Sequence, residues 1–204
     1  HIIEGYDGVI CNALYATKEL RSMRKTKFST LDKQKQGHDL VIGSCSAYTS
    51  TLVRESLIHY KPFFDHDDWL ASYCRYFGRL KMIDDPCQLY RQHEKNASPN
   101  NLNKVGIINK LKANTELTSK SKLRKIAESL KKVEYLQSLF VREFHKKNNT
   151  LERISNLEQK RLKCLNDTKT INCLISLFVL NKNYTTKEFV SDIIYIIKKK
   201  ICVK

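Results

Sequence analysis

The stretch FFDHDDWLASYCRYFG, residues 63–78, predicts an amphipathic helix with an acidic start. Asp65 stands where an N-cap residue is expected, and Gly78 is a typical C-terminal stop. Between them, apolar side chains recur at intervals of three and four residues, which places them on one helical face. Such a face has to be buried against another layer of structure. The apolar face consists of Leu70, Tyr73, Cys74 and Phe77.

The sequence on both sides of this helix supplies strands for that layer. Residues 6–16 and 39–48 are mostly apolar runs, which suit a buried sheet. Residues 80–83 and 87–92 predict two short strands separated by a turn at residues 84–86. A short helix is expected from Ser50 to about His59, and residues 17–38 are expected to form a surface excursion. The first part of the chain is therefore predicted to be α/β, a sheet with flanking helices.

The composition changes at residues 96–101, NASPNN, where we place a boundary between residues 1–97 and 98–204. Beyond it, apolar side chains follow helical spacing, and helices are expected at 171–180 and 187–201. Residues 97–204 carry 23 Lys and Arg against 9 Asp and Glu, whereas residues 1–96 carry 14 against 12. This basic, mainly α-helical region would attract phosphates of anionic lipid or nucleic acid. A solvated lysine-rich surface explains the same charge equally well.

Cysteine spacing and hydropathy exclude several classes of protein. The seven cysteines are scattered, with no pair at the two-residue gap of zinc knuckles, and this pattern suggests a reducing compartment. No apolar run reaches the length of a membrane span. The chain begins with His1 and has no signal-peptide pattern, so we expect a fragment or a processed piece.

The acidic cluster Asp65-His66-Asp67-Asp68-Trp69 is the sharpest candidate for chemistry. A carboxylate at a helix N-terminus lies in the positive field of the helix, as suits a general base that removes a proton from a hydroxyl. The adjacent Trp offers a face on which a sugar ring could stack. Ordinary capping by Asp, with Trp in the core, explains these residues too and is favoured when the cluster is considered alone.

A second polar cluster, Tyr90-Arg91-Gln92-His93, follows about 25 residues later at the end of a predicted strand. Arg supplies a fork of donors suited to a diphosphate, and His supplies a donor or a metal ligand. A charged turn is the simpler explanation of this cluster. Two such clusters joined by a helix and a strand nevertheless make a shared site more plausible.

Taken in order, these motifs resemble the rhamnosyltransferase-like members of the family-two bacterial glycosyltransferases over residues 5–97. The resemblance implies part of a GT-A domain, which transfers a sugar from a nucleotide diphosphate to an acceptor hydroxyl, usually with inversion. It implies Asp67 as the catalytic base, although Asp68 stands where the family more often has an aromatic residue. The motifs are Gly43-Ser44-Cys45, Pro62, His66-Asp67-x-Trp69-Leu70-Ala71, Phe77-Gly78, Ile83-Asp84-x-Pro86 and Leu89-Tyr90-Arg91-Gln92-His93-x-x-Asn96.

The resemblance also implies roles for other residues and a missing part. Acceptor binding is expected of Gly43, Ser44, His66, Asp68 and Trp69, and donor diphosphate binding of Arg91 and His93. The family's nucleotide-binding first half, with an Asp-x-Asp motif for Mg or Mn, should precede residue 1. No metal ligand is assigned in this chain, which is expected to be inactive by itself.

The expected partners are a nucleotide-sugar donor and a saccharide or lipid-linked acceptor of surface polysaccharide synthesis. The location implied is cytoplasmic, with peripheral contact at the inner face of the plasma membrane. Two alternatives stay open: a non-enzymatic basic helical module that binds nucleic acid or anionic membrane, and a degenerate transferase subunit. Nucleic acid is not the expected partner, because no recognised nucleic-acid motif is present.

Overall fold

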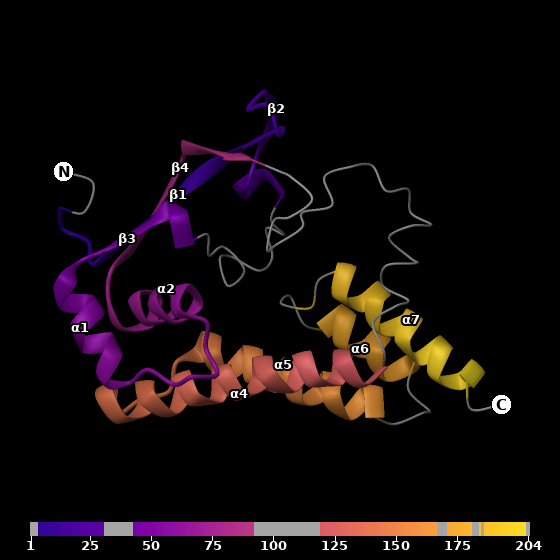
Figure 1. Cartoon of the computed structure of the whole chain (residues 1–204). Coiled ribbons are helices and arrows are strands. Elements are labelled where there is room, and N and C mark those ends of the chain that lie inside the picture. Colours follow the sequence, from indigo (N-terminus) through magenta and orange to yellow (C-terminus); the bar gives the residue numbers. More distant parts are fainter. Residues whose placement is uncertain are drawn as a thin grey trace. The chain divides into compact units, whose positions relative to one another are not determined.

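We analysed a computed structural model, which describes residues 4–30, 43–91, 119–166, 171–180, 184 and 186–202 (Figure 1). The chain divides into two compact units, unit 1 comprising residues 1–102 and unit 2 residues 103–204. The predicted boundary after residue 97 falls in residues 92–118, which lie outside the described residues. Each unit is described by itself below.

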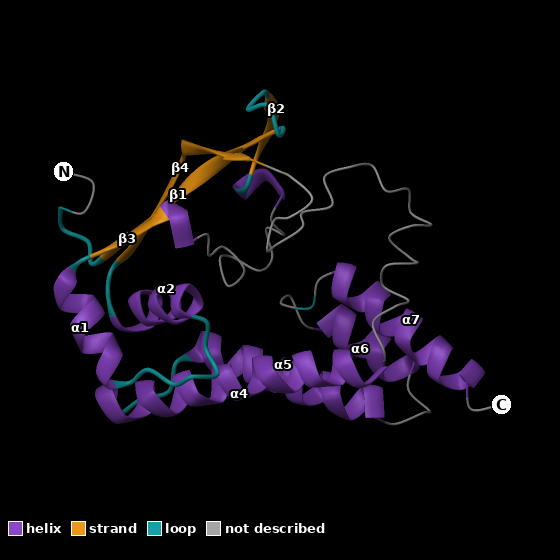
Figure 2. Cartoon of the chain, viewed as in Figure 1, coloured by secondary structure: helices purple, strands orange, loops and turns teal. Residues whose placement is uncertain are grey.

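Unit 1 is built on a mixed four-stranded sheet with β1 (Gly8–Ala16) at its centre (Figure 2). The long strand β4 (Leu80–Arg91) pairs with β1 in parallel along its whole length. Strands β2 (Ser22–Thr26) and β3 (Ser46–Tyr48) pair antiparallel with the two ends of β1. Because paired strands cover both of its edges, β1 is an almost continuous buried apolar run. The predicted α/β character is confirmed.

Strand β4 differs from its prediction, because residues 84–86 do not separate two strands. The pairing of β1 with β4 instead shifts register on both sides of Asn12, which is 1% exposed. The Asn12 Nδ2 atom donates to the Asp84 carbonyl over 2.8 Å, and its Oδ1 accepts from the Phe28 amide over 2.9 Å. A bulge thus absorbs the extra residues, and Pro86 is tolerated because β4 pairs only with β1 among the described strands.

Three other predictions in unit 1 are corrected in detail. The expected surface excursion contains β2 and a short 3₁₀ helix, Phe28–Thr30, while residues 31–42 lie outside the described part. Helix α1 (Ser50–Ile58) begins at Ser50, but Thr49 is its cap, with the Thr49 hydroxyl accepting from the Leu52 amide over 3.3 Å. Residues 43–45, expected as part of a strand, form the 3₁₀ turn η3 (Gly43–Cys45) before β3.

Helix α2 (His66–Phe77) forms over the predicted residues, although the Asp65 side chain makes no capping hydrogen bond. Of the predicted apolar face, Tyr73 and Cys74 are buried, together with Trp69 and Ala71, while Leu70 and Phe77 are half-buried. The Trp69 indole is 1% exposed, and its Nε1 donates to the Ser56 carbonyl of α1 over 3.1 Å. Its ring centroid lies 5.0 Å from that of Phe64. This aromatic core ties α2 to α1.

The start of β1 depends on a close approach that only glycine permits. A Cβ atom at Gly8 would lie 2.6 Å from Tyr48 Cδ1 and 2.7 Å from Cys74 Sγ. Both distances are shorter than van der Waals contact, so β3 and α2 pack directly on the backbone of β1 at this point.

We therefore expect Gly8→Ala to lower the free energy of unfolding of unit 1 by about 1–3 kcal/mol through overpacking. The emission of Trp69, the single tryptophan of the chain, reports this transition during urea denaturation. Adding Cys74→Ala removes one of the two clashes, so the double variant should lose less than the two single losses combined. Simple additivity would contradict this packing.

Unit 2 consists, among its described residues, of four helices: α4 (Ser119–Phe144), α5 (Asn149–Asn166), α6 (Ile171–Leu180) and α7 (Thr186–Cys202). The mainly α-helical prediction is confirmed. None of the described helices combines the length and apolarity required to cross a membrane. The helices share one core, composed of Ile126, Leu157, Cys164, Leu165, Leu174, Leu177, Tyr184, Tyr195 and Ile196.

The cysteines fall into two groups that the sequence did not distinguish. Cys11, Cys45, Cys74 and Cys87 are free thiols, all in unit 1. Cys164, in the core of unit 2, is disulfide-bonded. Among the described cysteines, the predicted free thiols are therefore found in unit 1 and not at Cys164.

Alkaline pH should destabilise unit 1 through two buried side chains of α2. Burial raises the pKa of Cys74 from 9.0 to about 12 and that of Tyr76 from 10.0 to about 12. Above pH 9 the unfolded chain therefore loses protons that the folded chain keeps, so stability falls as the pH rises through the folded values. The midpoint of the Trp69 transition in urea should decrease between pH 8.5 and 11. Cys74→Ala should decrease less steeply over this range, and an equal slope would refute the assignment.

Candidate functional site

Two of the predicted site residues, Gly43 and Asp67, meet at the turn η3. A Cβ atom at Gly43 would lie 3.2 Å from both Cβ and Oδ2 of Asp67. The backbone of the turn therefore lies directly against the Asp67 side chain. Two residues that are 24 positions apart in sequence, and that were assigned to one site by resemblance, are neighbours in space.

Asp67 is the second residue of α2 and is half-buried. Its Oδ1 accepts from the Asp68 amide over 3.0 Å, which orients the carboxylate. Unpaired backbone amides and the helix dipole favour negative charge at this end of a helix. The other oxygen, Oδ2, faces Gly43. The carboxylate is thus held on one side by its own helix and lies against a residue without a side chain on the other.

Strand β4 also contacts the turn η3, through Gln88 and Tyr90. Gln88 Nε2 donates to the Ser44 hydroxyl over 2.9 Å. Two residues on, Tyr90 packs against Cys45 and Ala13, and its ring lies edge-on to that of Tyr15 with centroids 5.9 Å apart. Gln88 was not predicted as a site residue. Its signal was period-two spacing, because residues 88 and 90 share one face of a strand.

The neighbours of Asp67 have different environments. His66 is exposed at the first position of α2, and Asp68 is half-buried beside Asp67. The acceptor role expected of Trp69 is wrong in this structure, because a side chain that is 1% exposed cannot stack on a sugar. Trp69 instead supports the helix that carries Asp67.

Of the donor-side residues, the structure describes only Arg91, which is not brought to the turn. Arg91 is the last residue of β4, exposed, and pairs in register with Ala16. Because successive side chains alternate between the faces of a strand, Arg91 points away from the face on which Tyr90 meets Cys45. His93 lies outside the described residues.

Three thiols lie near one another at the turn. Cys11 is on β1, Cys45 is the last residue of η3, and Cys87 is on β4. Burial raises the pKa of Cys11 to about 11, and its hydrogen bond with Cys87 and the charge of Cys45 act in the same direction. Burial also raises the pKa of Cys45. Neutral thiols are poor nucleophiles and poor metal ligands. Within the described ranges, no group of three or more His, Cys, Asp or Glu residues could hold a metal ion.

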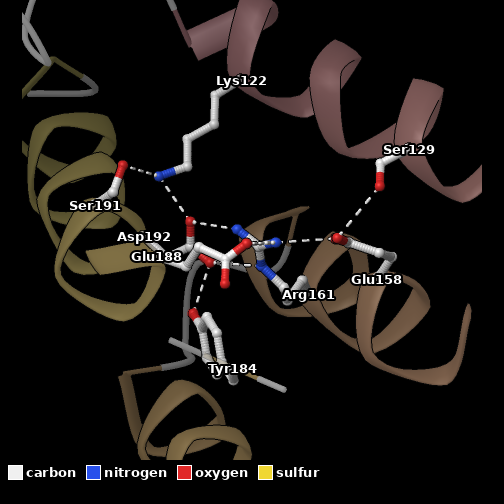
Figure 3. Close-up of polar contacts among 8 residues, drawn as sticks. All are labelled: Lys122, Ser129, Glu158, Arg161, Tyr184, Glu188, Ser191 and Asp192. Atoms are coloured by element: carbon white, nitrogen blue, oxygen red, sulfur yellow. Dashed lines mark hydrogen bonds and ion pairs between the residues drawn. The ribbon is translucent and has the colours of Figure 1, made fainter. Parts of the chain in front are cut away.

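A second polar cluster lies in unit 2, around the buried pair Arg161 and Asp192 (Figure 3). Arg161 Nε and Nη2 donate to the two oxygens of Asp192 over 3.0 and 3.3 Å. Arg161 Nη1 also donates to Glu158 over 3.0 Å and to Glu188 over 3.2 Å. One guanidinium thereby binds three carboxylates, and two of them, on Glu188 and Asp192, connect α5 to α7.

Asp192 is shared with two further groups. The Tyr184 hydroxyl donates to its Oδ2 over 2.6 Å, and Lys122 Nζ from α4 lies 2.6 Å from its Oδ1. Burial by itself lowers the pKa of Arg161, but the surrounding carboxylates outweigh burial and raise it. Burial lowers the pKa of Lys122, an effect that Asp192 opposes.

This cluster is a structural device, because its buried charges are already paired with one another. Asp192 is 0% exposed, so a substrate could reach it only by displacing its partners. Sequence reasoning missed the cluster. The available signal was Asp192 itself, a charge inside the apolar run of α7 whose burial requires a cationic partner.

Comparisons of the chain with protein-family models, curated proteins and solved structures find no match. The functional argument therefore depends on the geometry above.

Arg161→Met should strongly destabilise unit 2, by about 3–5 kcal/mol, because it removes the guanidinium that binds Glu158, Glu188 and Asp192 and leaves Lys122 as the cation at Asp192. The measurement is urea denaturation followed by far-UV circular dichroism, with Trp69 emission as a separate report on unit 1. Arg153→Met on the same helix is the matched control, since Arg153 is exposed, and should change stability by less than about 0.5 kcal/mol. A small effect of Arg161→Met would mean that the carboxylates find other partners.

Proposed function

We propose that unit 1 is the acceptor-side part of an inverting glycosyltransferase. The reaction moves a sugar from a nucleotide-diphosphate donor to a saccharide or lipid-linked acceptor in surface polysaccharide synthesis, at the inner face of the plasma membrane. The observation that carries the proposal is the contact of the Asp67 carboxylate with Gly43, two residues to which the resemblance gives roles in one acceptor site. The proposal combines this contact with the order of motifs along the chain.

In this proposal Asp67 is the general base. It accepts the proton of an acceptor hydroxyl while that oxygen attacks the anomeric carbon of the donor sugar from the side opposite the leaving diphosphate. The configuration at that carbon is inverted as a result. Orientation of Oδ1 by the Asp68 amide leaves Oδ2 to receive the proton. Positioning of this kind is what a base needs, because proton transfer requires hydrogen-bond distance.

Gly43 and Ser44 then form one wall of the acceptor site. A residue without a side chain at position 43 leaves Asp67 Oδ2 unobstructed at that point. The Gln88 amide fixes the Ser44 hydroxyl and so couples the wall to β4. His66, exposed at the start of α2, supplies a second polar edge of the same site.

The donor side of the reaction is assigned to groups beyond this arrangement. Arg91 and His93 would contact the donor diphosphate in the complete enzyme, and a Mg or Mn ion would neutralise the leaving group. Since the described residues offer no ligand set for that ion, no step here runs through a metal held by this chain.

Asp67→Asn should lower turnover of the complete protein by about 10²–10⁴-fold, because an amide cannot accept the proton. Turnover is measured as nucleoside diphosphate release from a panel of UDP-, dTDP- and GDP-sugars with lipid-linked acceptors. Donor binding, followed by isothermal titration, should be unchanged. Gly43→Ala should also lower turnover, since its Cβ would press on Asp67.

Asp65→Asn is the matched control. Asp65 is an exposed carboxylate two residues away whose side chain makes no capping hydrogen bond. Its substitution should leave turnover near the wild-type value. Retained turnover in Asp67→Asn would remove Asp67 from the base role, and absence of transfer with every donor would favour a degenerate subunit.

A further inference from the structure

Helices α6 and α7 expose an apolar face that none of the described residues of unit 2 covers. On α6, Ile175 is 46% and Val179 is 73% exposed, and their spacing of four residues puts them on one side. On α7, Val190 is 46% and Ile197 is 45% exposed, and their spacing of seven does the same. Together these four residues define what we call the apolar face.

The two helices present these side chains on the same side of their pair. Phe178 and Phe189 stack with ring centroids 4.4 Å apart, which marks the line of contact between the helices. Val179 and Val190 each follow one of these rings. Only five residues join the helices, so the chain direction reverses between them, and a step of about 100° per residue carries both valines to the same side.

The opposite side of the pair faces the core of unit 2. Leu174 and Leu177 of α6 and Tyr195 and Ile196 of α7 are buried there. The apolar face is therefore separate from the side of these helices that packs in the core of unit 2. Leucine-sized side chains exposed together on neighbouring helices mark a binding surface when they form a continuous patch.

The charge of this half of the chain selects the partner. Residues 97–204 carry a net charge of +14, and Lys198, Lys199 and Lys200 follow Ile197 directly in α7. A second copy of the chain on this face would bring two strongly cationic units together, which repulsion opposes. An anionic lipid surface instead attracts the charge and accepts the aliphatic side chains.

We propose that the apolar face of α6 and α7 inserts into the interface of an anionic lipid bilayer, with the helices lying in the membrane plane. The inference gives the peripheral membrane contact of the proposed function a defined surface, and to that extent rests on it. It makes no use of transferase chemistry, since lipid binding requires neither donor nor acceptor. The absence of a spanning helix among those described agrees with contact from one side.

The test is binding of the full chain to vesicles that contain 30% phosphatidylglycerol in phosphatidylcholine, measured by co-sedimentation across a salt series. The variant Ile175→Gln/Val179→Gln should bind about tenfold more weakly at every salt concentration, because it removes apolar insertion and no charge. Leu57→Gln/Ile58→Gln is the matched control, since these α1 residues are 60% and 79% exposed. It should bind like the wild type.

A second pair of variants reports insertion directly. Val179→Trp should show blue-shifted emission on vesicle addition and quenching by brominated lipid, whereas Ile58→Trp should show neither. Equal binding of wild type and the Gln variant, or no binding to vesicles at all, would overturn the proposal. Tighter binding to duplex DNA than to vesicles would assign the charge to nucleic acid. Self-association lost in the Gln variant would assign the face to a second copy.

Vesicle binding with Asp67→Asn should equal that of the wild type. Failure of the transferase proposal with intact lipid binding, or the reverse, can therefore be distinguished.

Discussion

The parallel pairing of β1 with β4 is the constraint on which unit 1 depends. Parallel neighbours cannot be joined by a tight turn, so the chain must leave the end of β1 and return to its beginning before β4 can start. Residues 17–79 make that return and contain β2, the turn η3, β3 and both helices. Every group of the candidate site except those on β4 is thus carried by one crossover, whose ends are fixed by the sheet.

The contact of Asp67 with Gly43 follows from how the crossover is closed. Strand β3 pairs with β1 at Gly8–Ile10, which fixes the turn that precedes it. Helix α2 packs on the same end of β1, where Cys74 lies against Gly8. The positions of the turn and of α2 therefore both depend on packing at the same end of β1. Trp69 connects α2 to α1 through its hydrogen bond to the Ser56 carbonyl. Substituting a core residue such as Trp69 would shift the position of α2, and with it that of the Asp67 carboxylate, although Asp67 itself is unchanged.

The sequence predicted the parts of this arrangement that depend on local pattern. Helix α2, the burial of Tyr73 and Cys74 on it and the buried character of β1 follow from spacing alone, and so do α6 and α7. It failed where distant groups decide the outcome. Asp84-Asp85-Pro86 has the composition of a turn, yet Asn12, 72 residues earlier, binds its backbone and makes it a bulge. Trp69 was expected to offer a face for stacking a sugar ring. Its indole N–H instead donates to the Ser56 carbonyl on α1, and the ring is buried in the core.

Contacts between residues far apart in the sequence also explain why α7 buries a charged residue and exposes apolar ones. Helix α7 buries Asp192 and exposes Val190 and Ile197, the reverse of a helix that serves only to cover a core. Burying Asp192 is possible because Arg161, Lys122 and Tyr184 come from three other segments, and that connection orients α7 about its axis. With Asp192 held inward, Val190 and Ile197 have to face outward, since they lie on the other side of the helix. The ion cluster therefore sets the direction in which the apolar face points.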